Sequence, residues 1–229
     1  MVALVLARVG EAVGPGVSLL ELEQVCVEVI KSKGGTPTFL GYRNFPRSVC
    51  ISVNEEVVHG IPSERRLVEG DIVKVDVGVT LDGLIADAAR TFEVGRVSPV
   101  VHELVQATEE SFWQGFAKCR PGSRVNDIGR AVQHSVESKG YSVVRELCGH
   151  GVGRNLHEEP SIPNFRTPGR GEKLRPGMTL AVEPMVNMGG YEVETLANNW
   201  TVVARDRRPS AHYEHTVLVT DAEPVILTA

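Results

Sequence analysis

Two pairs of segments repeat at almost the same spacing, and this repetition constrains the fold more than any other feature of the sequence. One helical pattern runs over 15–34, from a Pro-Gly pair to a Lys-Gly pair, and a second runs over 121–140, 106 residues later. The strand-like segment 70–76, which leads from a glycine to an acidic residue, matches 177–183, 107 residues later. Such patterns also arise by chance, but the common offset favours a duplicated α/β unit.

The local patterns fit a unit of helices and strands. Helical periodicity covers 2–13, 18–32, 98–119 and 125–138, and strand-like runs cover 48–53, 72–80, 84–92, 178–186, 200–204 and 212–220. The longest irregular segment is expected over 160–177. No linker separates the two copies. We therefore predict a single domain over 1–229, whose halves, approximately 1–105 and 106–229, are related by a pseudo-twofold axis and share a site between them.

Charge and cysteine content limit the expected partners and compartment. The 29 acidic and 24 basic residues give a net charge of −5, which argues against nucleic-acid and membrane partners, because both are negatively charged. The hydrophobic content of 42% excludes a disordered chain. The four cysteines lack CxxC spacing and are expected to be free thiols in the cytoplasm. The apolar run over 2–6 is too short to span a membrane, and no targeting signal is expected.

A pair of aspartates marks the first candidate site. Asp82-Gly83 is a strong signal for a two-residue hairpin turn between the strands 72–80 and 84–92. In that register Gly78 faces Asp87, so Asp76 and Asp87 are diagonal neighbours on one face. Adjacent carboxylates repel unless a proton or a cation lies between them. A solvated strand face is the alternative, but aspartate is disfavoured in strands, so a cation site is the better interpretation.

The second half supplies three further candidate ligands. Glu183 takes the place of Asp76 in the repeat, Glu214 lies in a later strand, and His150 stands between two glycines. Four carboxylates and one imidazole exceed what one ion needs and suit two divalent ions that share bridging carboxylates. A ligand set rich in oxygen and without thiolate suits Mn, Fe, Co or Zn and is unlike a structural zinc site.

Six short motifs along the chain belong together. They are NEEVVHGIP at 54–62, the eleven-residue step from Asp76 to Asp87, GHGVG at 149–153, LHEEP at 156–160, VEPMVN at 182–187 and YEHT at 213–216. Together they resemble the type I methionine aminopeptidases over about residues 15–228. The 31 residues from Glu183 to Glu214 leave no room for the helical insertion of the type II enzymes. The resemblance implies an α/β (α+β) pita-bread fold, with antiparallel sheets in two pseudo-symmetric halves around a dinuclear metal site.

The resemblance also implies a role for each site residue. Asp76 is the expected bidentate ligand of one ion, Asp87 and Glu214 bridge both ions, and His150 and Glu183 complete the other. The ions generate a hydroxide that attacks the carbonyl of an N-terminal methionine followed by a small residue.

Three of the implied roles are catalytic. His157 stabilises the oxyanion, Glu183 acts as general base and then as general acid, and His59 hydrogen-bonds near the scissile nitrogen. Without the resemblance, His59 would be interpreted as a capped loop residue and His157 as an exposed one. The remaining histidines, His102, His134, His212 and His215, are expected to be structural or on the surface.

The implied substrate pocket is apolar and binds the methionine side chain. In addition to His59 and His157 its walls are Phe39, Tyr42, Phe45, Cys50, Leu156 and Trp200, although plain core packing is the alternative for some of them. A monovalent cation is expected near Asn54 and Ser210. The expected partners are peptide and nascent-chain N-termini, with the ribosome as a candidate, and the expected state is a monomer.

Two other functions compete with this interpretation. A proline-specific aminopeptidase or dipeptidase of the same fold would keep the metal ligands, but such enzymes usually carry a further N-terminal domain and fit the 54–62 motif less well. A non-enzymatic binding module of this fold predicts lost ligands, whereas all five are present. The chain begins near the middle of the family's first helix, which is expected to cost packing but no metal ligand.

Overall fold

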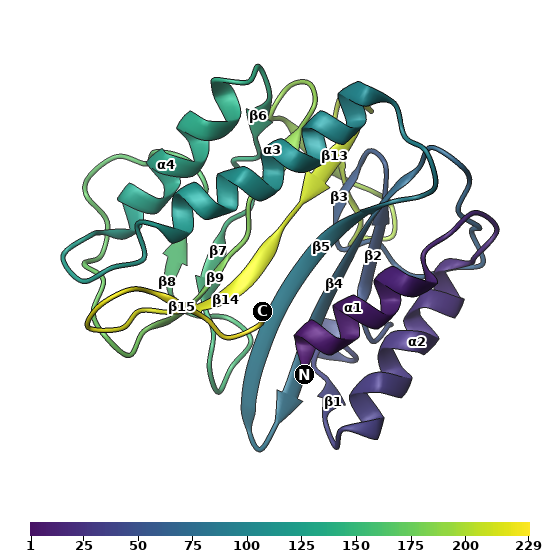
Figure 1. Cartoon of the computed structure of the whole chain (residues 1–229), viewed down its shortest axis with the longest axis horizontal. Coiled ribbons are helices and arrows are strands. Elements are labelled where there is room, and N and C mark those ends of the chain that lie inside the picture. The colour runs from purple at the N-terminus through teal and green to yellow at the C-terminus, as the bar shows by residue number, and fades with distance from the viewer.

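The computed structural model describes residues 1–229 and contains two pairs of helices packed on antiparallel sheets (Figure 1). The helices are α1 (Val2–Ala12), α2 (Leu19–Ser32), α3 (Pro99–Phe116) and α4 (Val125–Glu137), with a short 3-10 helix at Tyr42–Asn44. All four predicted helices are confirmed to within a few residues. No helix has both the length and the apolar character that crossing a membrane requires.

The strands are shorter and more numerous than the sequence patterns indicate. They are β1 (Thr36–Pro37), β2 (Cys50–Val53), β3 (Glu56–Val58), β4 (Ile72–Leu81), β5 (Leu84–Glu93), β6 (Ser142–Val143), β7 (Gly149–Gly151), β8 (Glu158–Ile162), β9 (Thr179–Val182), β10 (Met185–Asn187), β11 (Val193–Thr195), β12 (Val202–Ala204), β13 (Ser210–His212), β14 (Glu214–Leu218) and β15 (Val225–Ile226). The predicted irregular loop over 160–177 begins only after β8. Seven strands were not predicted, because two to five residues are too few for a periodic pattern.

The two halves contribute equivalent strands to one sheet. Its order is β1-β4-β5-β14-β9-β7-β8, so β5 and β14 pair at the centre and β4 and β9 flank them, while β2 pairs with β4 and β15 with β14. Two three-stranded sheets, β13-β10-β6 and β11-β12-β3, complete the structure. Both helix pairs lie over the same face of the large sheet (Figure 1).

The starts of α2 and α4 show the repeat at the level of single contacts. Ser18 caps α2, with its Oγ accepting the Glu21 N–H and the Glu21 carboxylate accepting the Ser18 N–H. At α4 the Asp127 carboxylate accepts the Arg124 N–H in the same way. Isolated β-bridges join Ser18 to Arg66 and Arg124 to Lys173, so the bridges are related by offsets of 106 and 107.

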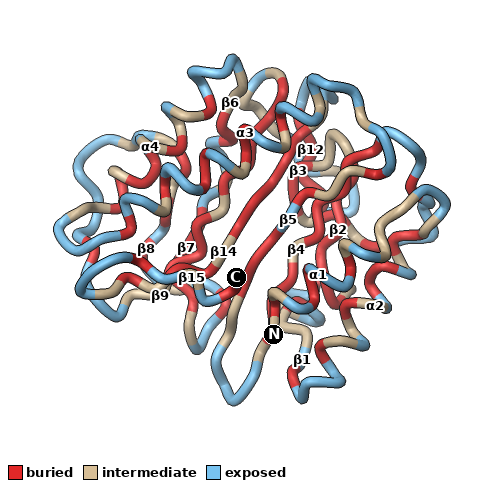
Figure 2. The backbone as a smooth tube through the Cα atoms, viewed as in Figure 1, coloured by how far each residue is buried: buried red, intermediate tan, exposed pale blue.

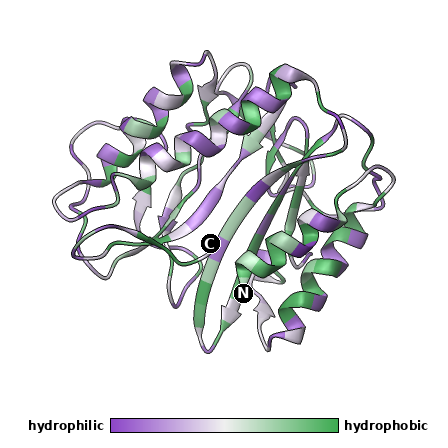
Figure 3. Ribbon diagram, in the orientation of Figure 1, coloured by the Kyte–Doolittle hydropathy of each residue, from purple (hydrophilic) through white to green (hydrophobic).

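Two hydrophobic cores of similar size stabilise the halves. One contains 18 buried residues, all between Val2 and Val94, and packs α1 and α2 on β2, β4 and β5. The other contains 19, and all but Ile72 lie between Leu104 and Val219. The buried stretches follow the strands and the inner sides of the helices (Figure 2), which are also the apolar sides (Figure 3). The tip of the β4–β5 hairpin is exposed.

The β4–β5 hairpin confirms the predicted register and explains its sequence. Gly78 pairs with Asp87, and Asp82 and Gly83 form the turn with φ of 51° and 75°. The valines at 73, 75, 77 and 79 point into the first core. Side chains alternate along a strand, so Lys74 and Asp76 point to the opposite face, away from α1 and α2.

Two predicted strands are wrong as continuous elements. The run over 178–186 breaks at Glu183-Pro184 into β9 and β10, and the run over 212–220 breaks at Tyr213 into β13 and β14. In each case the first and second parts belong to different sheets. The Tyr213 N–H donates to the Pro184 carbonyl, so the two breaks lie side by side. Apolar alternation continues across both breaks, which is why the pattern did not indicate them.

Candidate metal centre and substrate pocket

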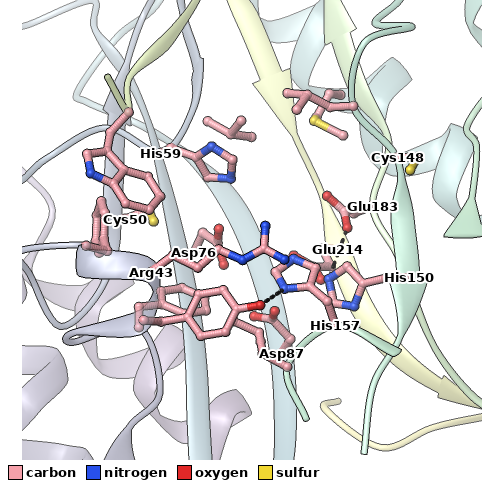
Figure 4. A pocket seen from close by; sticks show the side chains of 18 residues that line it. Arg43, Cys50, His59, Asp76, Asp87, Cys148, His150, His157, Glu183 and Glu214 are labelled. Atoms are coloured by element: carbon pink, nitrogen blue, oxygen red, sulfur yellow. Dashed lines mark hydrogen bonds and ion pairs between the residues drawn. The ribbon is translucent and has the colours of Figure 1, made fainter. Parts of the chain in front are cut away.

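One pocket brings together every residue that the sequence assigned to the site. Its cavity has a volume of about 170 Å³ and is lined by 18 residues from both halves of the chain. Figure 4 shows the carboxylates and histidines turned toward one another inside it. Thirteen of the lining residues were predicted: Phe39, Tyr42, Phe45, Cys50, His59, Asp76, Asp87, His150, Leu156, His157, Glu183, Trp200 and Glu214.

The acidic residues converge from strands at the centre of the large sheet. Asp76 and Asp87 come from the β4–β5 hairpin, Glu214 begins β14, and Glu183 follows β9 at the break before Pro184. The ligand atoms of Asp87, His150 and Glu214 lie within 4.8 Å of one another, and so do those of Asp76, His212 and Glu214. Glu214 belongs to both groups and therefore stands between two possible ion positions.

The carboxylates lack the partners that buried oxygens normally have. Asp76 Oδ1, Asp87 Oδ1 and Glu214 Oε1 are buried without a hydrogen bond, although such atoms are nearly always satisfied in proteins. Burial, reinforced by mutual repulsion, raises the pKa of Asp76, Glu183 and Glu214 well above the ordinary range. Burial likewise raises the pKa of Asp87 to about 7. Divalent cations would satisfy these oxygens and remove the repulsion, so the residues present fit a dinuclear centre.

His150 presents one nitrogen to this cluster. Its Nδ1 lies 2.9 Å from the Gly151 carbonyl, which can only accept, so Nδ1 carries the proton. The unprotonated Nε2 then lies 3.5 Å from Glu183 Oε1, in the state that a metal ligand requires. The structure gives a reason for the glycine that precedes His150: a Cβ at Gly149 would lie 2.2 Å from the Ala181 carbonyl oxygen of β9.

His212 is a residue that the sequence interpretation placed at the surface or in a structural role. It ends β13 with 1% of its surface exposed, and neither ring nitrogen has a hydrogen-bond partner. Its Nε2 lies 3.8 Å from Glu214 Oε2. Burial lowers its pKa to about 3, so the ring is neutral. His212 lies two residues before Glu214, but the strand breaks between them and its burial depends on tertiary packing, so no local pattern of the sequence indicates its role.

The predicted substrate residues form one apolar cluster beside the carboxylates. Phe39, Phe45, Cys50 and Leu156 are buried in it, and Tyr42 and Trp200 pack against them. The Phe45 and Trp200 rings meet edge to face at 5.0 Å. Cys50 pairs with Asp76 across β2 and β4, so the apolar wall and the first carboxylate are adjacent.

Two histidines lie at the junction of the apolar wall and the acidic cluster. His157 Nδ1 is 2.7 Å from the Tyr42 hydroxyl, and the His157 ring lies 4.1 Å from the His150 ring. Burial, with smaller effects of nearby positive groups, lowers the pKa of His157 to about 4, so its ring is neutral at pH 7. His59 follows β3 with a left-handed φ of 58°, and burial also lowers its pKa.

Sequence reasoning missed five of the lining residues. These are Arg43, Val58, Leu147, Cys148 and Met185. Arg43 has a left-handed φ of 48° and is exposed at the pocket rim. Val58 and Met185 lie within quoted motifs and Cys148 directly precedes one, but these side chains carry no chemical signal of their own. All four cysteines, including Cys148, are free.

Comparison with known proteins decides the family. The sequence model of metallopeptidase family M24 matches residues 1–221. The chain belongs to metallopeptidase family M24. Among similar M24 proteins, the methionine aminopeptidase of Clostridium perfringens is 51% identical, with 95% of this chain and 88% of that protein covered. Methionine aminopeptidase 1 of Bacillus subtilis is 47% identical, with 100% and 92% covered.

Solved structures agree with this assignment. The methionine aminopeptidase of Rickettsia prowazekii superposes with a TM-score of 0.97 at 41% identity, covering 99% of this chain and 92% of that one. The predicted resemblance and the pita-bread fold of this M24 protein are thus confirmed. Prolidase from Pyrococcus furiosus has a TM-score of 0.81, with 99% of this chain and 60% of that one covered, and at 21% identity this likeness concerns the fold alone.

Proposed function

We propose that this M24 protein removes the initiator methionine from peptides and nascent proteins whose second residue is small. The observation that carries the proposal is the contact between two unlike surfaces: buried carboxylate oxygens without partners lie directly beside an aromatic, thioether-compatible wall. The relatives that are 42–51% identical over most of their length are methionine aminopeptidases, which supports the same substrate class.

The proposed cofactors are two divalent ions, drawn from Mn, Fe, Co and Zn. Asp76 would hold one ion, His150 and Glu183 the other, and Asp87 and Glu214 both. Such ions polarise a carbonyl and lower the pKa of a bound water. The membership of Glu214 in both ligand groups supports a bridging position.

The residues of the chain supply proton transfer and orientation. Glu183 accepts a proton from the attacking water and delivers it to the leaving amine nitrogen. The neutral ring of His157, held at Nδ1 by the Tyr42 hydroxyl, donates from Nε2 to the oxygen of the scissile carbonyl. His59 hydrogen-bonds near the scissile nitrogen. A low pKa suits His157, because a neutral donor leaves the negative charge to the ions.

The walls of the pocket select the methionine side chain. Phe39, Phe45 and Trp200 offer ring edges and faces to a thioether, Leu156 completes the wall, and Cys50 lies beside Asp76 across β2 and β4. Residues 1–229 act as one catalytic unit with halves of about 1–105 and 106–229. We further infer a cytoplasmic monomer that acts on chains emerging from the ribosome; the free cysteines support this compartment.

Methionine release from Met-Ala and Ala-Pro peptides tests the proposal. Metal-stripped protein is reloaded with Mn, Fe, Co or Zn, and wild type is compared with Asp87→Ala and with Asp221→Ala, an exposed aspartate as matched control. We expect metal-dependent cleavage of Met-Ala by wild type and Asp221→Ala, and none by Asp87→Ala. Failure with all four metals would reject the function, and preferential cleavage of Ala-Pro would favour a proline-specific enzyme.

A further inference from the structure

Lys74 is among the largest fully buried side chains of the protein, with 1% of its surface exposed. It lies on β4 between Ser52 of β2 and Thr91 of β5, two residues before Asp76. Lysine is almost never fully buried unless it is paired. Lys74 does not line the pocket, so neither the metal centre nor the substrate wall accounts for it.

Lys74 hydrogen-bonds to a backbone carbonyl at the junction of the halves, where Asn54 of the first half meets Ser210 of the second. Its Nζ donates to the Asn54 carbonyl oxygen at 2.7 Å. The same oxygen accepts the Ser210 N–H of β13 at 3.0 Å. A carbonyl oxygen has two lone pairs, and both are therefore used.

Asn54 itself is fixed from several sides. It has a left-handed φ of 51°, its side-chain oxygen accepts the Ile72 N–H, and its side-chain nitrogen donates to Asp71. Ser210 is fixed as well, because its Oγ donates to the Val186 carbonyl. Beside the Ser210 N–H, the junction thus leaves room for one further donor at the Asn54 carbonyl, and Lys74 supplies it.

We propose that the Nζ of Lys74 takes the place of the monovalent cation expected near Asn54 and Ser210, so that this chain needs no such ion. An ion coordinated by the Asn54 carbonyl would have to displace either the Ser210 N–H or the Lys74 Nζ. The amine is covalently tethered, so it fills this position at any salt concentration. It also ties the turn before β3, which leads to His59, to the strand that carries Asp76.

Charges of both signs surround Lys74. The carboxylates of Glu55, Glu56 and Asp71 favour its charged form, and the positive charge of Arg65 disfavours it. Burial works against the charged form, but an amine donates a hydrogen bond in either protonation state. The contact with Asn54 therefore does not depend on the titration of Lys74.

Thermal unfolding in different salts tests the proposal. The melting temperature (Tm) of wild type, Lys74→Ser, Lys74→Met and the control Lys118→Ser, an exposed lysine, is measured in KCl, NaCl and choline chloride at equal concentration. Wild type and Lys118→Ser are expected to show the same Tm in all three salts. Lys74→Ser empties the space beside the Asn54 carbonyl and leaves that oxygen without its second donor. The Tm of this variant should therefore rise by roughly 5–10 °C when K⁺ or Na⁺ is at about 100 times its Kd.

Lys74→Met separates ion binding from simple loss of packing. Methionine fills the volume without a donor, so this variant should lose stability and stay insensitive to the kind of salt. A wild-type Tm that rises specifically in KCl or NaCl would overturn the proposal. So would a Lys74→Ser variant that responds equally to all three salts, or that stays unfolded in all of them. Broadening of the ²³Na signal by Lys74→Ser, and not by wild type, is the expected direct readout.

Discussion

Replacing a metal ligand is expected to stabilise the metal-free protein. In the stripped state the buried carboxylates repel one another and have no partners for several of their oxygens. Asp87→Asn removes one of these charges and leaves the shape of the side chain unchanged. We therefore expect stripped Asp87→Asn to be more stable than stripped wild type at pH 7.5, although the same change impairs ion binding.

The pKa of Asp87 sets the size of this difference in stability. Burial raises it from 3.8 to about 7, and each unit corresponds to about 1.36 kcal/mol, so the cost of ionising this group in the folded state is roughly 4 kcal/mol. The folded state holds a proton that the unfolded state releases. The free energy of unfolding therefore falls as pH rises from about 4 to about 7, and the cost is absent below and complete above this window.

The assay is urea unfolding after dialysis against a chelator, at several pH values from 4 to 7.5. Histidines whose pKa values are lowered, such as His157 and the buried His212, titrate with the opposite sign, so the readout is the difference between wild type and Asp87→Asn. Asp82→Asn in the exposed turn of the same hairpin is the control, with an expected effect within about 0.5 kcal/mol. A stripped Asp87→Asn protein that is less stable at pH 7.5, or a difference that does not change with pH, would refute the reasoning.

Four further outcomes are expected. His157→Ala should lower kcat for Met-Ala peptides roughly 10²–10³-fold, with an unchanged Tm, because it removes a donor to the developing negative charge. Peptides with N-terminal norleucine should be cleaved with a kcat/KM reduced by roughly tenfold or more, whereas equal cleavage of Met and Leu peptides would contradict the pocket. Gly149→Ala should lower the free energy of unfolding by roughly 1–3 kcal/mol in urea, since its Cβ would meet the Ala181 carbonyl. His212→Ala should weaken divalent-ion binding about 10–100-fold by calorimetry, because the ring lies against Glu214.

The first half of the site was predictable because it depends on local geometry. A two-residue turn at Asp82-Gly83 fixes the pairing of β4 and β5, and the pairing puts Asp76 and Asp87 on one face. That inference needs only the alternation of side chains and a turn type. The valines that alternate with polar residues along β4 then indicate which face is the core and which the site.

The contribution of Lys74 and His212 could not be predicted in this way. Each lies at an alternating position in a strand, where a lysine or histidine is ordinarily solvated. Their burial results from the contact between β13 and the β4–β5 hairpin: β13 lies against the face of β4 that carries Lys74, and the backbone of His212 bonds to the Thr91 hydroxyl of β5. Such coverage is a tertiary property, and no window of sequence around either residue contains it.

The breaks at Glu183-Pro184 and at Tyr213 explain why the second half holds its ligands where it does. β9 and β14 pair in the large sheet, while β10 and β13 pair in a smaller one. The segments β9–β10 and β13–β14 therefore change sheet at the same level. The Tyr213 N–H donates to the Pro184 carbonyl and joins the two crossings. Glu183 and Glu214 stand at this joint, where the backbone leaves one sheet for another and the carboxylates reach the pocket. Because Val182 pairs with His215, the next residues along the two strands, Glu183 and Glu214, come opposite each other on the same face, and the change of sheet that interrupts the periodic pattern places both of them at the end of the pair that borders the pocket.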